Sequence, residues 1–168
     1  KQPFYKKFKQ EAERLGLNPD FDRPGEWVRF NVPGDSREYS LELSKRDAEY
    51  LLRGFMSGDC TNCGPGYVTG SFLTSTASHI TDPGFFNFKI LRNGEWVGNV
   101  YAMAIREKNK PVLVIDALQI PWQSASPLFI PFDLSESKFP IVSEKDAIAV
   151  AEAVTRALSE YSAKTGFK

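Results

Sequence analysis

Both cysteines of the chain, Cys60 and Cys63, lie in the segment GDCTNC (58–63), which Gly-Pro-Gly follows directly. Cysteines at this spacing occur in redox pairs and in zinc sites, and one of them can also act as a nucleophile. A redox pair needs a stabilised thiolate, usually at the N-terminus of a helix. The charge of Asp59 disfavours a thiolate, and Gly-Pro-Gly opposes the start of a helix, so a redox role is disfavoured.

A zinc site would have to include residues outside this segment. The two cysteines and the only histidine of the chain, His79, supply three ligands, whereas a structural zinc site takes four. Asp59 or Asp82 would have to complete the set, or a water molecule in an open catalytic site. Because one Cys-x-x-Cys pair without a second is a weak indication of zinc, no metal is expected.

A catalytic cysteine needs an imidazole that takes its proton and a carboxylate that orients this imidazole. Cys60, His79 and Asp82 follow one another in that order, and the single histidine leaves no choice of base. Two alternatives stay open. His79 can bond to the backbone of its own loop, and the cysteines can belong to a glycine-rich turn without chemistry, which the sequence slightly favours.

Asp116 is a further candidate because it interrupts PVLVIDALQIP, the longest apolar-rich stretch of the chain. It either faces solvent or bonds to neighbouring backbone, or it is a carboxylate at a cleft, where burial would raise its pKa. The aromatic side chains of Trp122, Phe129 and Phe132 could line such a groove, although core packing is their more common use.

Hydrophobic periodicity predicts the elements that position these residues. The first 15 residues form an amphipathic helix that ends at Gly16. Two strands, EWVRFNV and YSLEL, flank a turn, and Ser44 caps a short helix that extends to Arg53. Residues 57–84 form a long polar segment, the first place to expect a site. The apolar face of the first helix contains Phe4, Tyr5, Phe8, Ala12 and Leu15.

An antiparallel meander is predicted over residues 85–121, because Asn-Gly between two β-rich runs is the strongest short indication of a hairpin. A second turn at REKNK leads to the third strand. Ser143 caps a final helix, and Gly166 ends it. The stripe expected to be buried contains Ala147, Val150, Ala151, Val154 and Leu158. These elements predict an α+β fold with helices packed on a central antiparallel sheet.

Length and composition favour one α+β domain over residues 1–168, and the start at lysine fits a piece of a longer protein. Lys plus Arg and Asp plus Glu both number 21, so no nucleic-acid partner is expected. No apolar run approaches the roughly 18 residues of a membrane span, so no membrane partner is expected either. Two cysteines are too few for a disulfide framework, which favours a reduced, cytoplasmic setting. The expected partner is a small-molecule or protein ligand.

The stretch FFNFKILRNGEWVGNVYAMAIREKNKPVLVIDALQIP and the capped helix ending YSAKTGF together resemble the centre of a GNAT-type acyltransferase. In that family a meander of this length presents a strand ending near a proline. A helix then packs back on the sheet and commonly closes on a Gly-Phe pair, as at Gly166-Phe167. The resemblance covers about Phe85–Phe167. It implies acyl-CoA as donor, a groove beside the strand Val112–Ile120, and Asp116 as the group that orients or deprotonates an amine.

The GNAT family binds the pyrophosphate of acyl-CoA with a Gly-rich turn, Gln/Arg-x-x-Gly-x-Gly/Ala. The matching residues 120–146 contain no glycine, and Glu144 and Asp146 would repel phosphate. The resemblance therefore implies an acyltransferase with an unusual donor site, or a degenerate relative that binds a ligand or partner. Two other functions stay open: a cysteine-dependent hydrolase or acyl-transfer enzyme built on Cys60, and a non-catalytic interaction module that uses the aromatic loop 122–132.

Overall fold

The computed structural model describes residues 3–45, 79–120 and 143–168. The predicted helix after Ser44 and the aromatic loop 122–132 fall almost wholly outside them. The described elements comprise two helices and five strands, which confirms the predicted α+β class and the helices at both ends. They are α1 (Pro3–Arg14), β1 (Gly25–Phe30), β2 (Tyr39–Leu43), β3 (Phe85–Arg92), β4 (Glu95–Glu107), β5 (Lys110–Gln119) and α4 (Glu144–Thr165).

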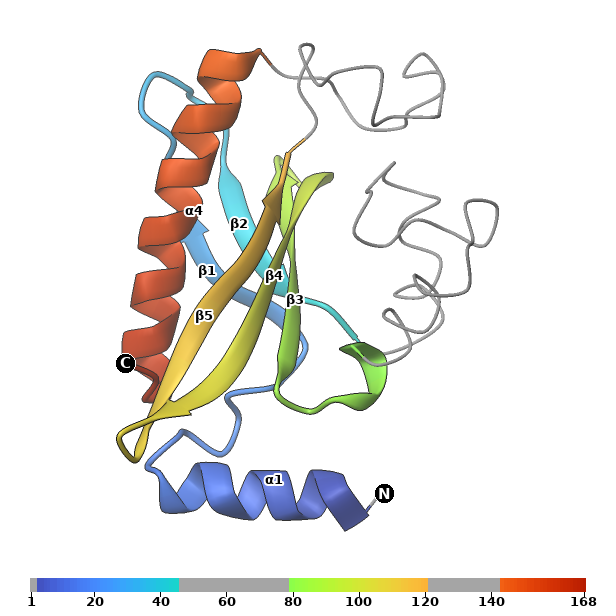
Figure 1. Cartoon of the computed structure of the whole chain (residues 1–168). Coiled ribbons are helices and arrows are strands. Elements are labelled where there is room, and N and C mark those ends of the chain that lie inside the picture. Colours follow the sequence, from blue (N-terminus) through green and yellow to red (C-terminus); the bar gives the residue numbers. More distant parts are fainter. Residues whose placement is uncertain (1–2, 46–78, 121–142) are drawn as a thin grey trace, which may run out of the picture.

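The five strands form one antiparallel sheet in the order β1-β2-β3-β4-β5, in which each strand pairs with its neighbours along the chain. Figure 1 shows α4 along one face of this sheet and α1 across its lower end. Two-residue turns close both predicted hairpins, with positive φ angles at Asn93 and Gly94 and at Lys108 and Asn109. Turns of this kind match the twist of the strands they join, so the meander follows from local sequence.

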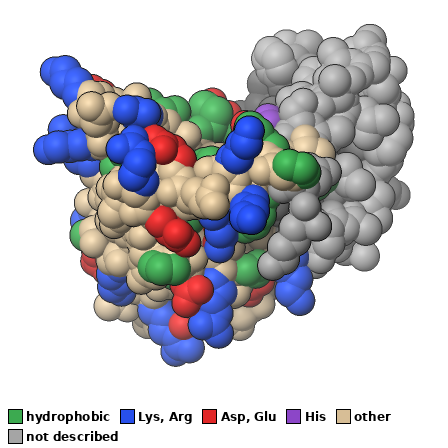
Figure 2. Space-filling model, turned by 90° about the horizontal axis from the view of Figure 1, so that it is seen from below, with side chains coloured by type: hydrophobic (Ala, Val, Ile, Leu, Met, Phe, Trp, Pro, Cys, Tyr) green, Lys and Arg blue, Asp and Glu red, His purple; other side chains and the backbone are tan. Residues whose placement is uncertain are grey.

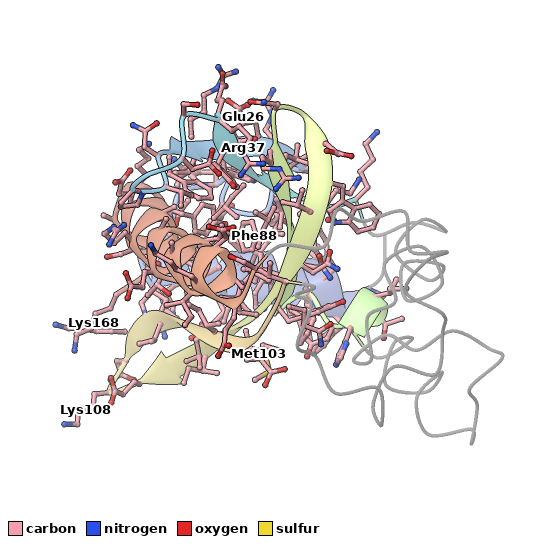
Figure 3. The ribbon with its side chains drawn as sticks, turned by 90° about the horizontal axis from the view of Figure 1, so that it is seen from above. Glu26, Arg37, Phe88, Met103, Lys108 and Lys168 are labelled. Carbon is pink, nitrogen blue, oxygen red and sulfur yellow. The ribbon has the colours of Figure 1, made fainter. Side chains whose placement is uncertain are left out.

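The main core lies between α4 and the sheet. Phe88 of β3 is fully buried there, and its ring meets that of Tyr161 edge-on at 5.2 Å; Figure 3 shows Phe88 between the helix and the strands. Burying one such side chain contributes about 1.5–3 kcal/mol. The predicted stripe of α4 is buried except at Ala151, which is half-buried, and Ala153, Ala157 and Tyr161 extend it.

The caps of α4 form as predicted. The Ser143 hydroxyl accepts a hydrogen bond from the backbone N–H of Asp146, and Gly166 adopts the left-handed conformation, with a φ angle of 90°. The loop after α1 packs directly against this cap. The N–H of Asn18 donates to the carbonyl of Thr165, and Phe167 is buried against the ring of Phe21. The loop after α1 and the C-terminal end of α4 are therefore in direct contact.

In α1, Phe8 and Ala12 face the core as predicted, but Phe4 is 62% exposed. The prediction for Phe4 is wrong because the core contacts of α1 begin one turn later, at Phe8. Seen from below, this end of the molecule carries acidic and basic side chains side by side (Figure 2). Lys9 of α1 forms an ion pair with Asp22 at 2.8 Å. No helix among the described residues is long and apolar enough to cross a membrane.

Candidate functional site

His79 begins the helical residues 79–81, which precede β3. Its ring is parallel to that of Phe85, at a centroid distance of 3.8 Å and an angle of 5°. Phe85 in turn packs on Tyr101 of β4, and these two buried rings form a second cluster with Ile80 and other half-buried groups. Phe86 and Ala102, their neighbours along the strands, belong to the main core. By strand alternation, His79 therefore sits on the sheet face that points away from α4.

A β-bulge positions Asp116. Tyr101 pairs with Ala117 and Ala102 pairs with Ile115, which leaves Asp116 as the extra residue of β5. In a regular strand Asp116 would share the helix-covered face with Leu118, which packs on the main core. The bulge breaks this alternation, and the Asp116 side chain is exposed. Bulges are over-represented next to active sites, where they redirect a side chain.

Burial and nearby charges shift the pKa of His79 in opposite directions. Burial lowers the pKa of its imidazole below the ordinary 6.5, whereas the negative charges of Asp116 and, to a smaller extent, Asp82 raise it. Burial has the larger effect, so the ring is neutral at pH 7 and able to accept a proton. A neutral imidazole near carboxylates is the arrangement that general-base catalysis needs.

Asp82 has a structural role as well. Its Oδ1 accepts a hydrogen bond of 2.8 Å from the N–H of Gly84, in the turn that leads into β3. The Phe85 N–H donates to the carbonyl of Asp82 in the same turn. These contacts fix where β3 starts and thus where His79 meets Phe85. The role of Asp82 as orienter of the imidazole stays a prediction, and Asp116 acts on His79 more strongly.

Polar side chains cross the middle of this sheet face. Four side chains form a row across it, because Glu42 pairs with Lys89, Lys89 with Asn99, and Asn99 with Gln119. The ammonium of Lys89 lies 5.2 Å from the ring centre of Trp96, whose Nε1–H donates to Asn99 Oδ1 at 3.2 Å. Asn99 is only 1% exposed. Burying a carboxamide is costly unless it is hydrogen-bonded, so this face is built for polar contacts rather than for packing alone.

The charges of Asp82 and Asp116 both act on His79, although the two acids lie 34 positions apart in the sequence. Cys60 and Cys63 lie outside the described residues. Within residues 3–45, 79–120 and 143–168, no three His, Cys, Asp or Glu side chains lie close enough to hold a metal ion. Sequence reasoning missed the rings under His79 and the bulge, because neither has a local sequence pattern.

Comparison with known proteins yields no match: no family model fits this sequence, and neither a curated protein nor a solved structure resembles the chain significantly. The candidate site therefore rests on its own geometry.

Proposed function

We propose that this protein is an acyl-transfer enzyme in which His79 acts as the general base. The observation that supports this most is the environment of the only histidine: a half-buried imidazole whose pKa burial lowers, within the influence of the exposed carboxylate of Asp116. A general base must be unprotonated at the working pH, and a lowered pKa keeps the imidazole neutral near pH 7.

The proposed step moves one acyl group and one proton. His79 takes a proton from an amine, a thiol or water while that group attacks the carbonyl carbon of a thioester or ester. The bond from this carbon to the leaving sulfur or oxygen then breaks, and the imidazolium returns the proton to the leaving group. Asp116 stabilises the transient imidazolium, although solvent screens the charge of an exposed carboxylate.

In the first form of this proposal the protein is a GNAT-like acyltransferase, with acyl-CoA as donor and an amine as acceptor. Three features support this form: the antiparallel meander, the helix α4 packed against the sheet, and the Gly166-Phe167 pair at the end of that helix. Residues 120–146 lack the glycines of the usual pyrophosphate turn, so the donor would bind differently.

In the second form Cys60 is the nucleophile and carries the acyl group before water or an amine removes it. His79 then deprotonates the thiol, and Asp82 or Asp116 stabilises the resulting imidazolium. The lowered pKa of His79 favours a histidine-dependent step and is common to both forms.

Two substrates and two cysteine variants test the proposal. Release of free CoA from acetyl-CoA with a primary amine, and of p-nitrophenol from p-nitrophenyl acetate, would be measured for wild type, Cys60→Ser and the matched control Cys63→Ser. Loss of turnover in Cys60→Ser alone assigns the covalent form, and turnover retained in both variants assigns direct transfer. If wild type accelerates neither reaction over the uncatalysed rate, the proposal is wrong.

A further inference from the structure

A surface hollow of about 350 Å³ lies between the β1–β2 loop and the first turns of α4. This is at the upper end of the molecule in Figure 1, whereas the turn that carries His79 is at the lower end. Small-ligand sites start at roughly this size, about 300 Å³. The loop side of the hollow includes Val32, Asp35 and Arg37, and the helix side includes Lys145, Asp146 and Ala149.

The loop side of the hollow has a fixed shape. Pro33 and Gly34 are the central residues of a β-turn in which the N–H of Asp35 donates to the carbonyl of Val32 at 3.0 Å. Gly34 has a φ angle of 82°, which the third position of a type II turn requires. The ring of Pro33 fixes its own φ angle, so the chain leaves this turn at Asp35 in a defined direction.

Asp35 then holds Arg37 in place. Arg37 Nε donates to both Asp35 oxygens, at 2.7 and 2.9 Å, and Arg37 Nη2 donates to Oδ2 at 2.6 Å. The buried Tyr39 donates its hydroxyl to the same oxygen at 2.7 Å. These hydrogen bonds hold the pKa of Asp35 well below its usual range, and those from Arg37 have the largest effect. The donors of Arg37 Nη1 have no acceptor among the residues that the structure describes.

The helix side of the hollow carries charges of both signs. Lys145 and Asp146 project from the first turn of α4, and the charge of Asp146 acts on Arg37. Arg37 and these two α4 residues border the same hollow. Figure 3 shows Arg37 from above. Pro33 and Ala149 add apolar surface, whereas Val32 and Val150 also border the hollow but are only 4% and 2% exposed. The hollow is therefore lined by the guanidinium of Arg37, which Asp35 holds in place, by the ammonium of Lys145, by the carboxylate of Asp146 and by a small apolar surface.

We propose that this hollow binds a small zwitterion with an apolar tail, the chemistry of a free aliphatic amino acid. The carboxylate of the ligand bonds to Arg37 Nη1 and pairs with Lys145, while its ammonium pairs with Asp146. The tail lies against Pro33 and Ala149. A simple anion is not favoured, because Asp146 opposes it, and a simple cation is opposed by Arg37 and Lys145. The proposal is independent of the function assigned to His79.

Calorimetry with L-leucine tests this site on the wild-type chain. We expect saturable binding with a Kd near or below about 1 mM. Leucinamide lacks the carboxylate and N-acetyl-leucine lacks the ammonium, so each should bind at least about tenfold more weakly. No heat with L-leucine, or equal binding of the three compounds, overturns the proposal.

Variants on α4 locate the binding. Lys145→Gln and Asp146→Asn are expected to weaken L-leucine binding about tenfold, whereas Lys164→Gln in the last turn of the same helix leaves it unchanged. Lys145 is exposed, so its substitution does not threaten the fold, which circular dichroism checks. Binding that survives Lys145→Gln undiminished contradicts the assignment to this hollow.

Discussion

The substitution His79→Gln is expected to lower the acyl-transfer rate by a factor of about 10² to 10⁴, the usual contribution of general acid–base catalysis. Glutamine retains a polar planar group near Phe85 but cannot accept a proton at neutral pH. The chain holds no second histidine that could substitute for it. Initial rates at pH 7.5, with circular dichroism to verify the fold, provide the measurement.

The matched control for this experiment is Met103→Leu. Met103 packs against Phe85 and Tyr101 on the same face of the sheet as His79, but its side chain cannot accept or donate a proton. A change of similar volume is tolerated in such surroundings. We expect the rate of this variant to stay close to that of wild type. A His79→Gln variant that keeps the wild-type rate would show that His79 only fills space beside Phe85.

The substitution Gly166→Ala is expected to lower the free energy of unfolding by about 2–4 kcal/mol. Gly166 has a φ angle of 90°, and a Cβ atom there would lie 2.6 Å from the backbone oxygen of Gly16. Alanine therefore adds a steric overlap to the backbone strain. Because backbone rather than a flexible side chain is in the way, the cap of α4 and the loop after α1 must separate. Urea denaturation measures the loss.

Gly16→Ala is the matched control, since Gly16 has a φ angle of 87° but open space where its Cβ would be. Gly16→Ala adds backbone strain but no steric overlap, so it should lower the free energy of unfolding by only about 1–2 kcal/mol. Equal losses in the two variants would contradict the close packing of the cap against Gly16.

The parts of the fold that the sequence predicts are those set by neighbouring residues. Asn-Gly determines the β3–β4 hairpin, and the side chain of Ser143 and the missing side chain of Gly166 determine the ends of α4. Strand register needs information from distant residues. Nothing near Asp116 indicates that β5 is bulged there, because the bulge depends on how Tyr101 and Ala102 pair with it.

The candidate site shows the same division. The polar segment before β3 and its single histidine are apparent in the sequence, and Asp82 is its nearest acidic neighbour along the chain. The stronger electrostatic partner, Asp116, lies two strands further on and reaches His79 only through the folded sheet. The sequence does not predict the stacking of His79 on Phe85 either, since the turn at Asp82 sets it.

An NMR titration of the His79 imidazole tests most directly whether His79 is a neutral base under the influence of Asp116. One histidine gives one set of ring signals. We predict a pKa below 6.5 in wild type and a lower one in Asp116→Asn, because the negative charge of Asp116 raises this pKa. Asp20→Asn, at an exposed site elsewhere, should leave it unchanged. A pKa at or above 6.5 that Asp116→Asn does not alter would contradict the account.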